Sequence, residues 1–177
     1  MHPLERMFGL SAHSILDVLQ RSNRLFVAVK GGIAQEHLRR RLRSLKRAGR
    51  LTDFDSIDQD GRPDFRVSYH GREFLIECKN VRRTLTRGEM AIDFMRTRYA
   101  ATEGRENRFY RPSEFHILAA CLFNQTGRWE FRYIPAARLS RHPRYGSRLD
   151  NRVSLGSSKR YFQLWTDDLP AALRMVR

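Results

Sequence analysis

Two short groups of charged residues in this sequence are of the types that divalent-metal chemistry uses. Asp64 follows Pro63, and Glu77-Cys78-Lys79 closes the next apolar run. Carboxylates are preferred Mg²⁺ ligands, and a lysine beside them can polarise a water or neutralise charge on a phosphate. Taken separately, Pro-Asp at a turn and Glu-x-Lys on a strand are also common on exposed hairpins. The chemistry therefore depends on whether the fold brings the two groups together.

The residues between the two groups predict a β-hairpin. Two runs of alternating character, DFRVSY and REFLIEC, are separated by His70-Gly71, a natural two-residue turn. Antiparallel pairing across this turn predicts a register that runs from Tyr69 opposite Arg72 to Asp64 opposite Glu77. The apolar side chains favour the same register, because they also face each other: Phe65 with Ile76 and Val67 with Phe74.

In this register the two carboxylates are directly opposed, and Lys79 lies on the same face because side chains alternate along a strand. Opposed residues have Cβ atoms about 4.5 to 5.5 Å apart, where like charges repel unless a cation lies between them. Mg²⁺, for which Mn²⁺ can substitute, takes one or two carboxylates plus waters and phosphate oxygens. Lys79 would orient the attacking water or neutralise charge on the scissile phosphate. We therefore predict phosphodiester hydrolysis at Asp64, Glu77 and Lys79.

The overall charge indicates a polyanionic partner. The 177 residues contain 34 Lys plus Arg and 19 Asp plus Glu, a net charge of +15 at pH 7. Nucleic acid is the expected partner, although a ribosome-associated protein, a membrane-surface protein or an arginine-rich proteome would show the same balance. Nearly all the basic residues are arginine, and the lysines are Lys30, Lys46, Lys79 and Lys159. Because lysine is rare in this chain, a lysine inside a motif is less readily explained as an ordinary surface cation that arginine could replace.

Several protein classes are disfavoured. The two cysteines, Cys78 and Cys121, are too few for a disulfide framework and lie in apolar runs that favour burial. The six histidines show no paired metal-ligand spacing. The first residues lack the apolar core of a signal peptide, and no apolar run is long enough for a membrane span. We expect a soluble cytoplasmic protein.

The expected elements are those of a mixed α/β domain with a central sheet flanked by helices. Helices are predicted over Ser11–Arg21 and Ile33–Ala48, with Gly31-Gly32 as a break between elements and Gly49 as a C-terminal cap. RLFVAVK, over Arg24–Lys30, predicts a short strand or an irregular connection. The further expected elements are a strand and turn in TDFDSIDQDG, a helical segment near Glu89–Ala100, a buried strand in Phe115–Phe123, a strand in Trp129–Ile134, a short strand in YFQLW and a helical turn in DDLPAALRMV.

Pro63-Asp64 followed by Glu77-Cys78-Lys79 resembles the PD-(D/E)xK nuclease superfamily, which has the restriction-endonuclease-like fold. The resemblance covers about half of the chain, from the helix near Ile33 to the strand ending at Phe123. It implies that Asp64 and Glu77 bind Mg²⁺ and that Lys79 assists the nucleophilic water. We expect a single nuclease domain over residues 1–177, with a catalytic core at about 24–134 and a basic C-terminal extension at 135–177.

Many members of this family add an acidic residue from the preceding helix, and here Glu36 is the candidate. At about 100° per residue, Glu36 points away from the stripe formed by Leu38, Leu42 and Leu45, whereas Gln35 lies nearer the core-facing side. Three alternatives remain open. Glu36 binds the metal from an irregular first turn, Gln35 takes the place of the acid, or Glu36 only counters the helix dipole.

Substrate contacts are predicted after the catalytic strand. Arginines there could follow a phosphate backbone, although solvated surface arginines would show the same pattern. They are Arg82, Arg83, Arg87, Arg96 and Arg98, with Arg105, Arg108 and Arg111 in the next loop. Tyr99, Phe109 and Tyr110 either stack on bases or belong to the core, and the core is favoured. Gln163, in YFQLW, is a further candidate site residue.

Together these features predict a small Mg²⁺-dependent DNA endonuclease, serving restriction or defence and acting on double-stranded DNA. A homodimer is expected, because one such site cuts one strand. One alternative is a structure-selective nuclease of the Holliday-junction-resolvase kind. The other is a non-catalytic nucleic-acid-binding module or subunit with the same fold.

Overall fold

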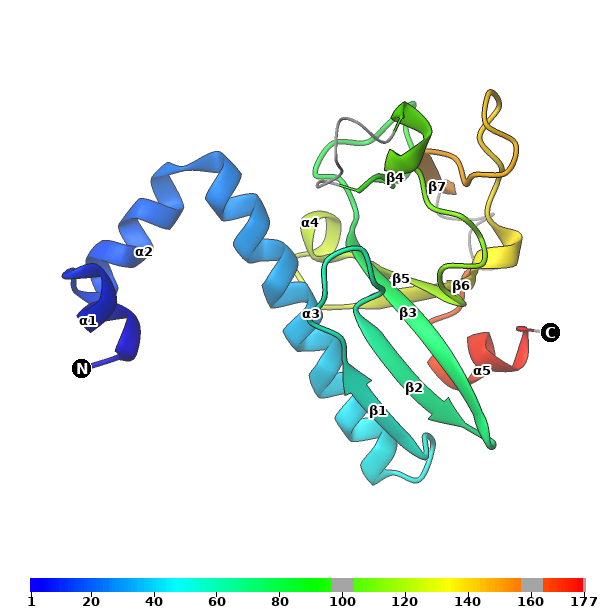
Figure 1. The fold of residues 1–177 in the computed structure, drawn as a ribbon, viewed down its shortest axis with the longest axis horizontal. Coiled ribbons are helices and arrows are strands. Elements are labelled where there is room, and N and C mark those ends of the chain that lie inside the picture. The colour runs from blue at the N-terminus through cyan, green and yellow to red at the C-terminus, as the bar shows by residue number, and fades with distance from the viewer. Residues whose placement is uncertain (97–103, 157–163, 177) are drawn as a thin grey trace.

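The computed structural model describes residues 1–96, 104–156 and 164–176. It has the predicted mixed α/β architecture, with a five-stranded sheet in the order β1-β2-β3-β5-β6 and a helical arm that extends from the body (Figure 1). The strands are β1 (Asp53–Ser56), β2 (Phe65–Tyr69), β3 (Arg72–Asn80), β4 (Met90–Asp93), β5 (Ile117–Cys121), β6 (Phe131–Pro135) and β7 (Arg152–Gly156). The α-helices are α1 (Pro3–Phe8), α2 (Ala12–Arg21), α3 (Asn23–Arg47), α4 (Phe123–Thr126) and α5 (Leu169–Arg174), and the 3₁₀ turns are η2 (Arg105–Arg108) and η3 (Ala136–Arg138).

The β2–β3 hairpin has the predicted register. Tyr69 pairs with Arg72, and the antiparallel ladder continues to Phe65 opposite Ile76. His70 and Gly71 both have positive φ, 48° and 74°, as a two-residue turn of type I′ requires. The ladder stops one pair before Asp64 and Glu77. Asp64 therefore lies at the open end of the hairpin, where its side chain is free to bond elsewhere.

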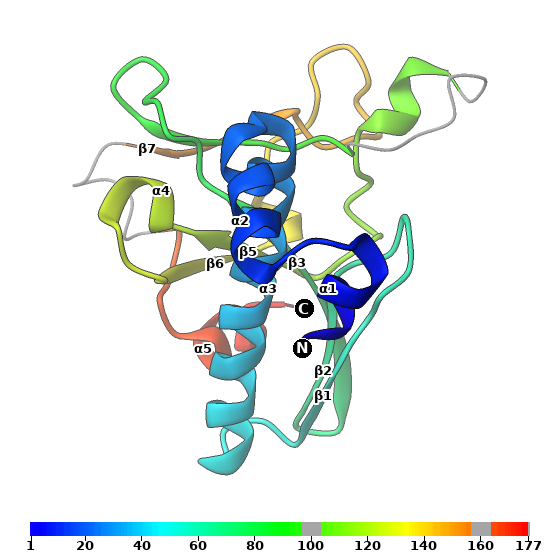
Figure 2. The same cartoon turned by 90° about the vertical axis from the view of Figure 1, so that its left-hand side faces the viewer.

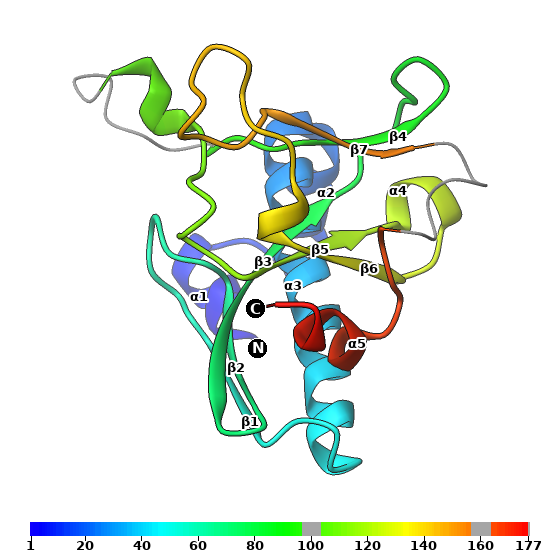
Figure 3. The ribbon, with the colours of Figure 1, turned by 90° about the vertical axis from the view of Figure 1, so that its right-hand side faces the viewer.

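β3 and β5 form the parallel centre of the sheet. All five residues of β5 are buried, as the apolar run predicts. On one face, Ile117 and Ala119 pack with Ile76 against leucines of α3 and α5. On the other, Leu118 and Ala120 pack under the two-stranded sheet of β4 and β7. Figure 3 shows the β4–β7 pair on the opposite side of β5 and β6 from α5.

α3 corrects one prediction. Arg24–Lys30 is helical rather than a strand, and Gly31-Gly32 lies inside the helix rather than at a break. Figures 1 and 2 show α3 continuing from the arm into the body without interruption. A glycine in a helix costs only about 1 kcal/mol. That cost is too small to end a helix whose second half packs through Leu38 and Leu42 against the sheet. The predicted cap is confirmed, since Gly49 has φ 67° and follows the last turn.

Two further predictions are wrong in the region after the hairpin. Residues near Glu89, expected to be helical, contain strand β4, which pairs with β7. β7 lies in the basic C-terminal extension, where the sequence predicted no strand before YFQLW. Each strand is stabilised by a partner distant in sequence, which local periodicity does not reveal. Of YFQLW, residues 161–163 lie outside the described residues.

Other predictions are confirmed by the structure. The helix capped by Ser11 is α2, and the closing helical turn is α5. Cys78 and Cys121 are buried and unbridged. Among the described residues, no helix combines the length and the apolar character needed to cross a bilayer.

Candidate active site

A cleft of about 490 Å³ opens at the end of the β2–β3 hairpin, beside α3. Asp64, Glu77 and Lys79, the three residues that the hairpin register predicted to share one face, all line it. α3 contributes a wall, the loop after β1 contributes a rim, and Arg96 and Tyr110 come from the segment after β4. The cleft is therefore built from four parts of the chain around the hairpin end.

Asp64 is held by two hydrogen bonds. Its Oδ2 accepts from the backbone N–H of Cys78 at 2.7 Å, and its Oδ1 accepts from the Gln35 side-chain amide at 2.6 Å. Burial, followed by the negative charge of Glu77, raises the pKa of Asp64 to about 7. The charge of Glu77 thus disfavours ionisation of Asp64, and both side chains line the same cleft.

Glu77 is the most buried acid of the cleft, with 3% of its surface exposed. Its Oε1 contacts Lys79 Nζ at 2.6 Å and accepts a hydrogen bond from the Tyr110 hydroxyl at 2.7 Å. Burial alone would lower the pKa of Lys79, but the adjacent Glu77 carboxylate together with Tyr110 and Asp64 outweighs burial and raises that pKa. Burial and Glu77 also raise the pKa of Tyr110. At neutral pH, Lys79 is a cation and Tyr110 a neutral donor.

Tyr110 lines the cleft and bonds Glu77, whereas the sequence predicted only a base-stacking or core position for it. Its ring belongs to the core, as favoured, and stacks on Phe94 with centroids 4.5 Å apart. Its hydroxyl, however, reaches Glu77. Arg96 places its guanidinium 4.9 Å from the same ring and pairs with Glu114 at 2.5 Å. No sequence spacing links Tyr110 to the hairpin, because Tyr110 follows Glu77 by 33 residues.

The structure separates the two candidates from the preceding helix. Gln35 lines the cleft and bonds Asp64. Glu36 does not line the cleft. Its two oxygens are bound by Arg39 and Arg40 at 2.7 and 2.9 Å. The Glu36 side chain therefore does not lie at the position expected for a metal ligand. Gln35 instead lies beside Asp64 in the cleft.

The predicted DNA-binding arginines differ in position. Arg96 lines the cleft, whereas Arg82 pairs with Asp93 at 3.5 Å, and Arg83 and Arg87 are exposed beyond it. Arg62, which the sequence did not single out, lies on the cleft rim. Phe109 is in the core, packed against His142 and Tyr145. Arg98, Tyr99 and Gln163 lie outside the described residues.

The donor set fits a hard divalent cation. Asp64 and Glu77 offer carboxylate oxygens, and Gln35 can offer an amide oxygen. Within residues 1–96, 104–156 and 164–176, no group of three or more His, Cys, Asp or Glu side chains converges. Two carboxylates suit Mg²⁺, which keeps several waters and takes few protein ligands. The charge of Glu77 helps to raise the pKa of Asp64, and a cation bound by both carboxylates would offset that repulsion.

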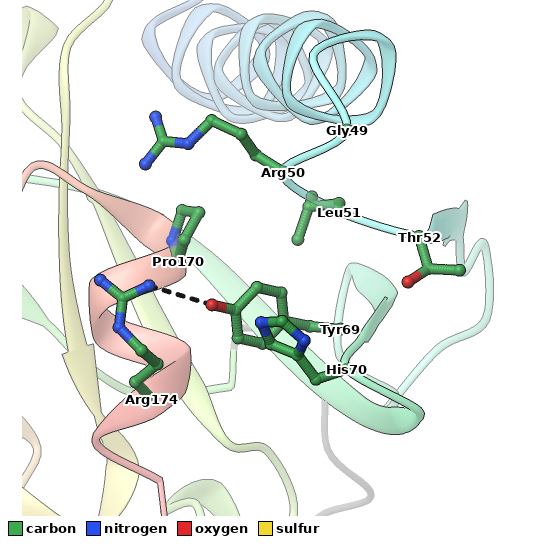
Figure 4. A pocket seen from close by; sticks show the side chains of 8 residues that line it. All are labelled: Gly49, Arg50, Leu51, Thr52, Tyr69, His70, Pro170 and Arg174. Atoms are coloured by element: carbon green, nitrogen blue, oxygen red, sulfur yellow. Dashed lines mark hydrogen bonds between the residues drawn. The ribbon is translucent and has the colours of Figure 1, made fainter.

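A second pocket, of about 290 Å³, lies where α3 ends, beside the hairpin turn and α5 (Figure 4). The Tyr69 hydroxyl accepts a hydrogen bond from Arg174 there at 3.0 Å, and Arg50 pairs with Asp168 at 2.5 Å. None of the residues that line this pocket is an acid. It therefore offers no counterpart to the Asp64–Glu77 pair.

The fold is similar to that of a bacterial homing endonuclease of known structure. The TM-score is 0.52 at 20% sequence identity, over 78% of this chain and 87% of that chain. No family model and no curated protein matches the sequence. The similarity shows that this mixed α/β domain, with its five-stranded sheet flanked by helices, has a fold that a nuclease also uses.

Proposed function

We propose that this protein is a metal-dependent DNA endonuclease of the PD-(D/E)xK type. The observation that carries the proposal is the convergence of Asp64, Glu77 and Lys79 in one open cleft, with both acids held by hydrogen bonds. The similar fold of a homing endonuclease and the net charge of +15 support it. Restriction or defence against foreign DNA is the proposed role.

Each residue of the cleft has a distinct task. Asp64 and Glu77 would hold Mg²⁺, which when bound supplies an activated water and offsets charge on the phosphate. Gln35 and the Cys78 amide orient the Asp64 carboxylate, and Tyr110 orients that of Glu77. Lys79 keeps its proton and so presents a fixed positive charge beside the reacting phosphate.

DNA is the proposed substrate because basic residues line the cleft around the Asp64 and Glu77 carboxylates. Arg62 and Arg96 line the cleft and offer positive charge to a phosphate backbone there. Such contacts position a backbone without reading its sequence. Affinity for DNA should therefore fall steeply as salt concentration rises.

The test is cleavage of supercoiled plasmid and of four-way junctions with Mg²⁺, with Mn²⁺ and with EDTA. We expect cleavage with either metal and none with EDTA. Asp64→Asn should abolish cleavage and leave DNA binding intact. Asp55→Asn, which changes an exposed acid of β1 outside the cleft, is the matched control and should keep full activity. Preferential cutting of junctions would favour the resolvase alternative. DNA binding without metal-dependent cutting of either substrate would favour the non-catalytic module.

A further inference from the structure

The exposed apolar side chains of this protein are concentrated in the first 33 residues. Of the fifteen large hydrophobic residues exposed in the described part of the chain, twelve lie between Met1 and Ile33. α1 and α2 contain no buried residue. In Figure 1 these helices and the start of α3 extend away from the body as an arm. We call residues 1–33 the N-terminal arm.

Residues 25–29, near the start of α3, are all apolar and exposed. Leu25, Phe26, Val27 and Val29 are 43%, 44%, 61% and 37% exposed, and Ala28 between them is also exposed. Successive helical residues point about 100° apart, so five in a row cover the whole circumference. A helix that is hydrophobic all round belongs in the interior of an assembly. The arm therefore requires a partner that covers it.

The charge of the arm indicates a protein partner. Residues 1–33 contain four basic and two acidic residues, so only +2 of the net charge of +15 lies there. A surface for nucleic acid would be strongly basic. An apolar surface with a few charges of both signs is instead the composition of a protein interface.

A second copy of this chain is the partner that fits. The body, residues 34–177, holds the remaining charge, and two bodies would repel each other, whereas two arms can meet with little repulsion. A stable interface uses about 20 to 30 residues a side, which an arm of 33 residues can supply. Two-fold dimers, in which the same patch serves both subunits, are the commonest oligomers.

We propose that the N-terminal arm is a dimerisation element that packs against the same arm of a second copy. The consequence for cleavage rests on the proposed function. Ala28, Gly31 and Gln35 line the active-site cleft and belong to the same helix as the apolar segment. Gln35 follows Val27 by eight residues, about 12 Å along the helix axis. Paired arms would therefore hold two clefts near the dimer axis, so that both DNA strands are cut in one encounter.

Sedimentation velocity of the full chain, from low to high micromolar concentration in EDTA and high salt, tests the arm without reference to activity. We expect the wild type to sediment at twice the 20.9 kDa of one chain. Val27→Asp in α3 and Leu16→Asp in α2 should each reduce the mass to 20.9 kDa. Leu85→Asp is the matched control, because Leu85 is 54% exposed and lies outside the arm. It should remain dimeric.

A wild type that stays at 20.9 kDa throughout would overturn the proposal, as would arm variants that remain dimeric. Two substitutions on different helices keep the test valid if circular dichroism shows that one of them misfolds. On plasmid, the wild type should produce linear DNA, and the monomeric variants should produce mainly nicked circles. A dimer that dissociates in the variants but never cuts DNA would support the arm and contradict the proposed function.

Discussion

The Tyr110 hydroxyl and the Lys79 ammonium contact the same oxygen of Glu77, at 2.7 and 2.6 Å. Glu77 thus enters the cleft with one oxygen fixed by two donors. Hydrogen bonds to a buried ionised group are among the stronger ones in proteins. The loop that carries Tyr110 is therefore coupled to the hairpin that carries the acids, and this coupling is testable.

Tyr110→Phe should weaken the site without unfolding the protein. The ring keeps its stacking on Phe94, while Glu77 loses one donor. Loss of such a supporting hydrogen bond typically lowers metal affinity or activity about 10- to 100-fold. Titration calorimetry with Mg²⁺ and plasmid cleavage should show this decrease. Tyr145→Phe, which removes a hydroxyl outside the cleft, is the control. Equal effects of Tyr110→Phe and Tyr145→Phe would contradict a role for the Tyr110 hydroxyl in the site.

Lys79→Met should abolish cleavage and lower the free energy of unfolding by about 2 kcal/mol, because it leaves the buried Glu77 charge without its ionic partner. The double variant Glu77→Gln/Lys79→Met should recover most of that loss, since no unpaired charge remains. Urea denaturation measures both changes. Lys46→Met, which breaks an exposed pair with Asp53, should cost less than about 1 kcal/mol. A double variant no more stable than Lys79→Met would contradict a buried Glu77–Lys79 pair.

The raised pKa of Asp64 predicts a pH-dependent stability of the metal-free protein. Its pKa rises from 3.8 to about 7 on folding, so its contribution is present below pH 3.8 and is lost as pH increases through about 7. Asp64→Asn lacks this titration. In EDTA, the wild type should therefore lose stability relative to Asp64→Asn between pH 4 and 7, as measured by thermal unfolding. A difference in Tm that stays constant with pH would show that the Asp64 pKa is not raised.

The same titration predicts how metal binding depends on pH. A cation binds the carboxylate form, so Mg²⁺ affinity should increase with pH up to about 7, and binding near neutrality should release protons. Calorimetry in buffers with different ionisation enthalpies measures that release. Binding of Mg²⁺ without proton release near pH 6 would indicate that Asp64 is already ionised.

Gln35→Ala and Glu36→Gln should differ in their effects, although the two residues are adjacent. Gln35→Ala removes the amide that holds Asp64, so cleavage should fall by about tenfold or more. Glu36→Gln breaks only partly exposed pairs with Arg39 and Arg40, and should leave cleavage within about twofold. Initial cleavage rates at saturating Mg²⁺ decide between them. A greater loss of cleavage rate with Glu36→Gln than with Gln35→Ala would indicate that Glu36 belongs to the site.

The sequence by itself determined the centre of the candidate site. Strand alternation and the two-residue turn at His70-Gly71 are local properties, and together they specified the register that brings Asp64, Glu77 and Lys79 to one face. The buried strand β5 was evident for a similar reason, because a run that is apolar on both faces has to be covered on both sides. Charge and composition, which need no fold, indicated the polyanionic partner.

Tertiary structure decided what surrounds that centre. The β-branched run before Gly31 favoured a strand locally, but the cooperativity of α3 made it helical and left it exposed on the arm. β4 and β7 formed because each is the other's partner across a long separation. Gln35 and Tyr110 reach the two acids, and Arg96 reaches the cleft, only through the packing of α3 and of the segment after β4 against the hairpin. Local patterns specify a strand pair and its turn, whereas contacts between distant segments depend on how the whole chain packs.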